Sequence, residues 1–330
     1  MADLKIMWRI PANPTDESRR TLFIDQIAET LDFISGRLEG AFLDDHFFPW
    51  AAIDHPGGRE FLSNAVDTLE CWTAITYWAA SFPKLAFGAL VLCQSYRHPA
   101  VVAKMGATLQ LLTGGRFVMG LGAGWREDEY QAYGFDFPAA GVRLTQLAES
   151  IEIIKAMWAG GAASYSGRYY QIHNAYCEPT PHPMPPLLIG GGGEKVTLRI
   201  VAKHADWWNY CDTPEVFGQK LEILRQHCLE IGRPFDEIVK TWDGIQITVA
   251  ESDAEAQRIF EASPYRRRGR VVGTPDRVAA RLKQYIDLGV DIFFLRFDDF
   301  PEQRGIRLFT EEVLPQLQIA HANARQGAHV

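Results

Sequence analysis

Apolar and polar residues follow one another along this chain in two alternating rhythms. Short continuous apolar runs are separated by longer stretches in which apolar residues recur every three or four positions. A short continuous run is typical of a strand buried on both faces, and the longer rhythm is typical of an amphipathic helix. Eight runs predict strands, at Leu4–Ile10, Gly40–Asp45, Leu85–Val91, Phe117–Leu121, Leu187–Ile189, Asp206–Tyr210, Ile245–Ala250 and Ile292–Phe297.

The helical rhythm fills most of the intervals between these runs. Strands that alternate with helices form parallel sheets covered on the outside. Because no linker interrupts the alternation, we expect one (β/α)8 TIM barrel that takes in residues 1–330, with 321–330 as a flexible tail. The helices are expected at Thr21–Ile34, Leu69–Ala80, Val101–Leu112, Leu144–Trp158, Glu194–Lys203, Pro214–Ile231, Thr274–Leu288 and Ile306–Leu317.

Two stretches interrupt the regular alternation. Pro49–Val66 follows the second predicted strand, and Tyr165–Pro186 precedes the fifth. Barrel enzymes carry their chemistry on the loops at the carboxyl ends of the strands. We therefore expect both stretches to emerge on that face or to cover part of it.

Charge and composition exclude several classes of partner. The net charge of −8 argues against a nucleic-acid partner, and the one basic cluster, Arg266–Arg270, predicts a solvated loop or a site for an anionic group. No apolar run is long enough to span a membrane and the first residues show no signal-peptide pattern, so we expect a cytoplasmic protein without membrane contact. The five cysteines and nine histidines lack metal-binding spacing, which predicts reduced thiols and no metal.

Residues 114–130 carry the densest concentration of candidate chemistry. The predicted strand Phe117–Leu121 runs into Gly122, Ala123 and Gly124, and polar residues follow. A small-residue loop at the carboxyl end of a strand lets the backbone approach a flat or phosphorylated ligand. The glycines lack the G-x-G-x-x-G spacing of a dinucleotide-binding loop, and a purely structural turn is the alternative interpretation.

Six motifs spread over about residues 4–317 resemble the bacterial-luciferase-like flavin and deazaflavin oxidoreductases. Their order and spacing agree with that family along nearly the whole chain. The motifs are Asp45-His46-Phe47, Asp67–Trp72, Tyr96–Ala100, Gly114–Tyr130, Ile189–Gly193 and Gly273-Thr274-Pro275.

Within the family, two of these motifs indicate the cofactor. Asp45-His46-x-x-Pro49-Trp50 together with Gly190–Gly193 is similar to the branch that uses the deazaflavin coenzyme F420. The branch that uses FMN, usually with a separate reductase, remains the alternative. The resemblance implies a non-proline cis peptide behind the cofactor ring, for which Leu90–Val91 is the candidate.

The resemblance also implies residues that hold the cofactor. Asp45, Leu90 and Val91 would lie against the ring, and Cys93 and Asp128 match positions that contact the cofactor. The run of Gly190, Gly191, Gly192 and Gly193 leaves backbone N–H groups to face a phosphate, because it ends a strand and opens onto a predicted helix. Lys195 is either a further phosphate contact or a solvent-exposed lysine.

The predicted catalytic residues are His46, Asp45 and Trp50. Imidazole titrates near neutral pH and is suited to move the proton that accompanies a hydride. The alternative is that Asp45 and His46 pair with each other and cap a strand. Phe48, Trp50, Trp125 and Tyr165–Pro186 are expected to line the substrate pocket.

Trp125 occupies the place of a glutamate that the family's sugar-phosphate dehydrogenases carry, which makes a sugar phosphate a doubtful substrate. Glu127 or Glu129 could replace that acid, or both could be solvated residues at a helix start. The sequence thus favours hydride transfer between F420 and a small, largely apolar molecule. The alternatives are an FMN-dependent monooxygenase and a barrel that only binds flavin.

A homodimer is expected from surplus apolar residues on two outer helices, each of which needs only one apolar face against the barrel. These residues are Trp72, Ile75, Tyr77, Trp78, Val101, Val102 and Met105.

Overall fold

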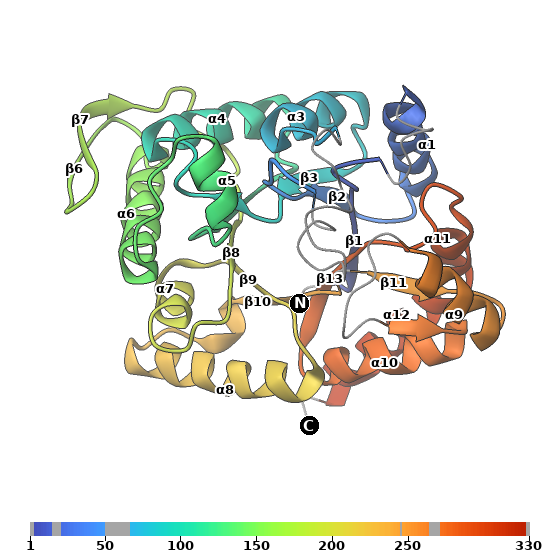
Figure 1. The fold of residues 1–330 in the computed structure, drawn as a ribbon. Helices are drawn as coiled ribbons and strands as arrows, with labels where there is room; N and C mark the ends of the chain where they lie inside the picture. Colours follow the sequence, from blue (N-terminus) through green and yellow to red (C-terminus); the bar gives the residue numbers. More distant parts are fainter. Residues whose placement is uncertain (1–2, 15–20, 50–66, 245, 264–270, 328–330) are drawn as a thin grey trace.

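The computed structural model describes residues 3–14, 21–49, 67–244, 246–263 and 271–327, and its centre is a closed parallel barrel (Figure 1). The strands are hydrogen-bonded in the order β3-β2-β1-β13-β10-β9-β8-β5-β4, and an additional pairing of β3 with β5 closes the ring. The predicted TIM barrel is confirmed. The barrel strands are β1 (Lys5–Arg9), β2 (Gly40–Leu43), β3 (Ala86–Ala89), β4 (Leu92–Cys93), β5 (Phe117–Gly122), β8 (Leu187–Gly190), β9 (Trp207–Tyr210), β10 (Val239–Asp243) and β13 (Val290–Leu295).

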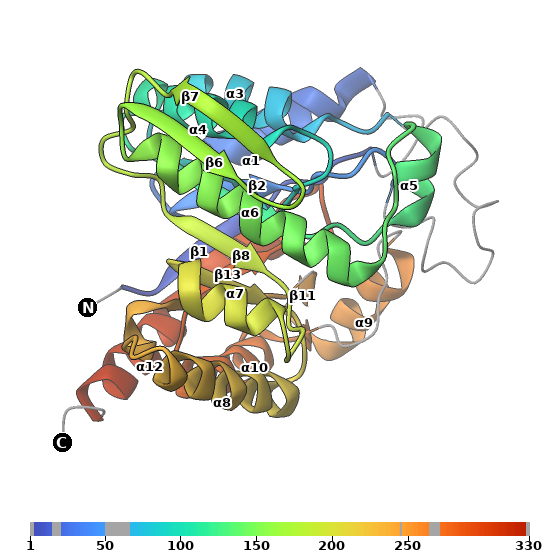
Figure 2. The same ribbon diagram turned by 90° about the vertical axis from the view of Figure 1, so that its left-hand side faces the viewer.

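Helices surround the barrel on the outside (Figures 1 and 2). None of the described helices is long and apolar enough to cross a membrane. The main helices are α1 (Phe23–Ile34), α3 (Cys71–Ser81), α4 (Pro99–Leu112), α5 (Glu127–Ala132), α6 (Ala140–Trp158), α7 (Thr197–His204), α8 (Pro214–Glu230), α9 (Asp253–Ala262), α10 (Pro275–Asp287), α11 (Arg304–Leu308) and α12 (Leu314–Gly327), and one turn of π-helix, η4 (Phe309–Val313), joins α11 to α12.

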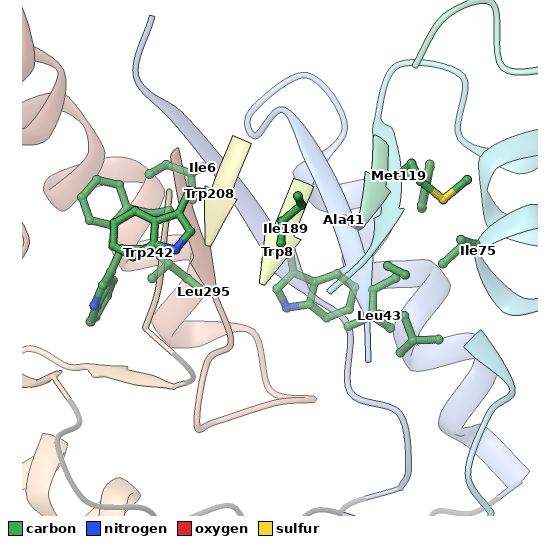
Figure 3. Close-up of a cluster of buried hydrophobic side chains, with 14 of the residues drawn as sticks. Ile6, Trp8, Ala41, Leu43, Ile75, Met119, Ile189, Trp208, Trp242 and Leu295 are labelled. Atoms are coloured by element: carbon green, nitrogen blue, oxygen red, sulfur yellow. The ribbon is translucent and has the colours of Figure 1, made fainter. Parts of the chain in front are cut away.

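Side chains on the strands alternate between two buried clusters. The larger cluster lies between the strands and the helices, and Figure 3 shows some of its members, among them Trp8, Leu43 and Trp208. The smaller cluster fills the inside of the barrel, because successive residues of a strand point to opposite faces. Its buried members are Met7, Phe42, Leu90, Val118, Leu188, Ile292 and Phe294.

The seventh barrel strand differs from the prediction. The barrel uses β10 (Val239–Asp243), whereas the apolar run expected at Ile245–Ala250 forms β11 (Ile247–Val249), which pairs with β12 (Val271–Gly273) outside the barrel. The prediction was wrong because β10 carries polar side chains into the buried interior. Thr241 donates to a backbone carbonyl of β9 and accepts a hydrogen bond from the Asn209 amide, so these polar groups are satisfied without an apolar pattern.

The segment Tyr165–Pro186 also lies elsewhere than expected. Its first part continues from β6 (Ala162–Ser166) into β7 (Gln171–Tyr176), and this hairpin covers the outside of α4 and α6 (Figure 2). The segment follows a helix, so it starts from the amino-terminal end of the barrel and cannot be a loop of the opposite face. Only the turn of this hairpin approaches the carboxyl ends of the barrel strands, where the Tyr170 hydroxyl donates to Gln94 at 3.0 Å.

The chain remains helical beyond residue 320, where the sequence predicts a flexible tail. Helix α12 continues to Gly327, and His321 within it is buried with its Nε2 2.9 Å from Asp291. This contact ties the end of the chain to the start of β13. The predicted loop at Pro49–Val66 and the basic cluster at Arg266–Arg270 lie outside the described residues, except for Pro49.

Candidate active site

A buried carboxylate organises the loop that follows β2. Both oxygens of Glu129, at the start of α5, accept hydrogen bonds from that loop, including the backbone N–H groups of Phe47 and Phe48 at 2.8 and 2.9 Å. Nδ1 of His46 lies 2.9 Å from Oε2, and the Tyr96 hydroxyl donates to the same oxygen at 3.1 Å. Because a carboxylate only accepts, Nδ1 carries a proton in this pair. Glu129 thus fixes the tautomer of His46 and the path of its loop.

Electrostatics keep this carboxylate ionised. Burial alone would raise the pKa of Glu129, but the hydrogen bond and charge of His46, the Phe48 N–H and the Arg126 guanidinium together lower it below its ordinary value. The side chain is fully buried. The sequence offered two interpretations of Glu129, a compensating acid or a solvated residue at a helix start, and the second is wrong.

Asp45 has a different set of partners. Its carboxylate receives two hydrogen bonds from Arg97, at 2.8 and 3.0 Å, and one from the backbone N–H of Cys93 at 2.9 Å. Arg97 also contacts Glu70, whose carboxylate caps the amino end of α3. Asp45 and His46 therefore do not pair with each other. The contacts of Asp45 fit an anchoring role between strands. The catalytic and cofactor-binding roles predicted for it stay predictions.

A flat apolar platform lies at the carboxyl end of β3 and its neighbours. The Leu90–Val91 peptide bond is cis, as the sequence analysis predicts. Glycines on two neighbouring strands make room for Val91, since a Cβ at Gly122 would lie 2.7 Å, and one at Gly190 3.2 Å, from its methyl groups. Val91 is only half-buried. This arrangement fits a flat ring laid against Val91, as the resemblance implies.

Cys93 follows the platform and faces the protein interior. Its Sγ lies 3.0 Å from the Tyr130 hydroxyl, and burial raises the pKa of the thiol to about 11, so the group is neutral at pH 7. A buried neutral thiol acts mainly as a small packing residue. The cofactor contact predicted for Cys93 remains a prediction.

The glycine run at the end of β8 does not open a helix, and residues 194–196 form a turn after it. Gly191 has a φ of 125°, which favours glycine, and a Cβ at Gly192 would collide with the Tyr210 ring. The sequence predicted a helix that starts at Glu194, but α7 begins at Thr197, so three residues separate the glycine run from the helix. Lys195 within this connection is exposed.

The remaining predicted residues lie around the entrance of the barrel. Trp125 is half-exposed, and its ring contacts the His46 ring edge to face at 5.6 Å between centroids. Asp128 forms an ion pair with Arg126, whose guanidinium also donates to the backbone carbonyl of Phe48 at 2.8 Å. Trp50 lies outside the described residues. The structure therefore places the His46 ring against Trp125 and ties the Phe48 backbone to Glu129 and Arg126, while the predicted roles of these residues stay predictions.

A layer of charged side chains at the mouth of the barrel was not predicted. Arg9, Asp44 and Arg296, which are buried, and Asp243, which is partly buried, stand at the carboxyl ends of four neighbouring strands. Arg9 bonds Asp44 and, at 3.0 Å, Asp243, while Arg296 bonds Asp44 at 3.1 Å. Each residue comes two places after an inward-facing residue of its strand, so this period could have revealed the layer. We call these four residues the charged layer.

Among the described residues, no group of three or more His, Cys, Asp or Glu could hold a metal ion. None of the five cysteines forms a disulfide with another described residue, and Cys211 is the exposed one.

Comparison with known proteins agrees with this geometry. A parallel barrel that carries a histidine–carboxylate pair and a glycine-lined platform at the carboxyl ends of its strands is suited to hold a flat ring at the barrel mouth. The model of the luciferase-like monooxygenase family matches residues 37–270, and the chain belongs to that family. It is an enzyme, an oxidoreductase that acts on a small-molecule substrate. The resemblance found in the sequence is confirmed.

Three similar proteins are each less than 30% identical to this chain. An F420-dependent glucose-6-phosphate dehydrogenase from Microbacterium testaceum is 28% identical over 326 residues, covering 88% of this chain and 91% of that protein. The structure of an F420-dependent secondary alcohol dehydrogenase with an F420–acetone adduct has a TM-score of 0.78 at 16% identity and covers 96% of this chain and 99% of that one. A riboflavin lyase structure with modified FMN has a TM-score of 0.79 at 18% identity, with 96% and 92% covered.

Proposed function

We propose that this protein is an F420-dependent oxidoreductase that interconverts a small alcohol and the corresponding carbonyl compound. The observation that carries the proposal is the His46–Glu129 pair beside the Val91 platform, because such a reaction moves a hydride and a proton together. Relatives named as F420-dependent dehydrogenases, of a sugar phosphate and of secondary alcohols, support the same cofactor and reaction class. A reducing, cytoplasmic location accompanies this proposal.

The residues at the barrel mouth fit the cofactor. Val91, with Leu90 behind it, would support the ring. The glycine run Gly190–Gly193 would face the phosphate, with Lys195 as a further phosphate contact. Asp128 would contact the cofactor from another side. When bound, F420 supplies a ring that accepts or donates a hydride.

The protein's own contribution is the handling of the proton. With Nδ1 donating to Glu129, the Nε2 atom of neutral His46 is the nitrogen that can accept the hydroxyl proton of an alcohol. The hydride from the carbinol C–H of the alcohol would pass to bound F420, and Nε2 of His46 would take the O–H proton as the carbonyl forms. Glu129 stays ionised and stabilises the resulting imidazolium, in the way a buried carboxylate supports a catalytic histidine. In the reverse direction His46 returns the proton.

Cofactor choice is the first test. We expect F420 to bind with micromolar or tighter affinity and FMN much more weakly, as measured by fluorescence titration of the purified protein. The reverse order would favour the alternative, an FMN-dependent monooxygenase served by a separate reductase. The fold is also similar to that of a long-chain alkane monooxygenase. Weak binding of both cofactors would contradict the proposed function.

We also propose a homodimer that pairs through α3 and α4, which lie side by side in both views (Figures 1 and 2). The structure changes the residues that could make the contact. Ile75, Trp78 and Val102 are buried within the single chain, whereas Tyr77 and Val101 are 62% and 53% exposed. A charge at Trp78 would therefore disrupt the core, and the contact has to involve the exposed side chains.

Light scattering tests the dimer. We expect a mass twice the 37.1 kDa of one chain, and we expect Val101→Glu to reduce it to that of a monomer without loss of helical content. Leu229→Glu on α8, where the leucine is 72% exposed, is the matched control and should leave the mass unchanged. A monomeric wild-type protein would refute the dimer.

A further inference from the structure

We infer that the charged layer and Gln246 together form a subsite for a neutral polar group of the substrate, an amide or a hydroxyl. The inference rests on the proposed function and adds the substrate class, which the sequence analysis had placed among largely apolar molecules.

The position of the charged layer is the first argument. Directly beneath it, the inside of the barrel is apolar on three of the four strands, with Met7, Phe42 and Phe294 two residues before Arg9, Asp44 and Arg296. The layer thus lies at the carboxyl ends of the strands, on the face where barrel enzymes bind their substrates. Buried ion pairs stabilise a fold weakly, since desolvation offsets most of the attraction. Fold stability alone therefore gives little reason for this layer, and substrate recognition supplies one.

Unpartnered polar atoms are the second argument. Gln246 is 1% exposed, yet neither its Nε2 nor its Oε1 has a hydrogen-bond partner among the residues that the structure describes. The same holds for Nε of Arg9. Buried polar groups in folded proteins are almost always paired, and each one left unpaired costs stability. Such a cost is explained when a ligand completes the hydrogen bonds.

Gln246 belongs to the same end of the barrel as the charged layer. It follows Asp243, the last residue of β10, by three positions, and the N–H of the next residue, Ile247, donates to the Arg296 carbonyl at 2.8 Å. The glutamine backbone therefore lies between the ends of β10 and β13. An amide side chain here can both donate and accept.

The charges indicate that the bound group is neutral. Two guanidinium groups and two carboxylates give the layer no net charge, and Asp44 and Asp243 already neutralise the arginines. A carboxylate or phosphate would meet the buried Asp44 and the partly buried Asp243 as well as the cations. A group with one donor and one acceptor matches the Gln246 amide and the Arg9 Nε–H instead.

Three compounds with one carbon skeleton test the inference: 2-propanol, 2-hydroxypropanamide and 2-hydroxypropanoate. Each is added at equal concentration to the F420-loaded protein, and the shift in Tm and the Kd are measured. We expect the amide to bind at least about tenfold more tightly than 2-propanol and than the carboxylate, which corresponds to one or two buried hydrogen bonds. In Gln246→Met, of similar length, this advantage should disappear.

Two further readouts make the result decisive. F420 affinity should be the same in Gln246→Met, and its Tm without substrate should be equal to or higher than that of the wild type, because an apolar replacement of an unpaired buried amide is neutral or stabilising. Gln257→Met, at an exposed glutamine of α9, should keep the amide preference.

Other outcomes contradict the inference in distinct ways. Equal binding of the amide and 2-propanol, a preference for the carboxylate, or an amide preference that survives in Gln246→Met would each overturn the subsite. Failure to bind F420 in the wild-type protein would instead overturn the proposed function.

Discussion

Replacing His46 by alanine is expected to lower kcat about 10²–10⁴-fold, the usual contribution of one acid–base group, while F420 affinity stays within several-fold. The imidazole is assigned to the proton and not to the cofactor, so turnover and binding should separate. F420 reduction in the steady state gives kcat, and fluorescence titration gives the affinity. The substitution removes one of the donors to Glu129 but leaves the backbone N–H groups of Phe47 and Phe48 in place.

Two companion variants give this result its meaning. His173→Ala, at an exposed histidine of the outer hairpin, is the matched control and should react like the wild type. Glu129→Gln keeps the size of the side chain but removes its charge, so it should lower kcat and change the pH profile of kcat, which a purely structural role of Glu129 would not do. Normal turnover by His46→Ala would show that His46 is structural.

Replacing Asp44 by alanine is expected to lower the free energy of unfolding by about 3–5 kcal/mol. The carboxylate is buried between Arg9 and Arg296, and its removal leaves both guanidinium groups in the interior without that partner. Urea denaturation followed by circular dichroism measures the change. Asp287→Ala breaks a half-exposed ion pair with Lys283 and should change stability by no more than about 1 kcal/mol.

The loss caused by Asp44→Ala should also depend on pH. Burial alone would raise the pKa of Asp44, but Arg9 and Arg296 outweigh it and hold the pKa below its ordinary value. A lowered pKa in the folded state stabilises the protein at pH values above the unfolded pKa of about 3.9, and the contribution fades as the pH falls below it. The wild type should therefore lose its advantage over the variant in acid. A constant difference between neutral pH and pH 3 would contradict this assignment.

The sequence predicted the barrel well because most strands are uniformly apolar and followed by a helix. It failed at β10, where Lys240, Thr241 and Asp243 interrupt the apolar run. Thr241 and Asp243 are satisfied by Asn209 and Arg9, which are distant in sequence. The more apolar run at 245–250 was chosen instead. A pattern along one strand does not show which polar residues find buried partners.

The site was predicted from the resemblance more than from the residues themselves. The cis bond at Leu90–Val91 and the grouping of His46, Phe48 and Trp125 were expected, and the first is confirmed. The role of Glu129 was not recognised, since its partner His46 is 83 positions away. The charged layer lies on four separate strands, so only its inward period was visible in the sequence.

The bonds of Glu129 also limit how this protein can be recombined with its relatives. One carboxylate holds the histidine ring and two backbone N–H groups of the loop after β2, while belonging to the turn after β5. The two loops therefore have to be kept together in any recombined chain, although α3 and α4 lie between them in the sequence. A chimera that takes one loop from this chain and the other from a relative with different spacing would break the unit, so crossover points belong before β2 or after α5.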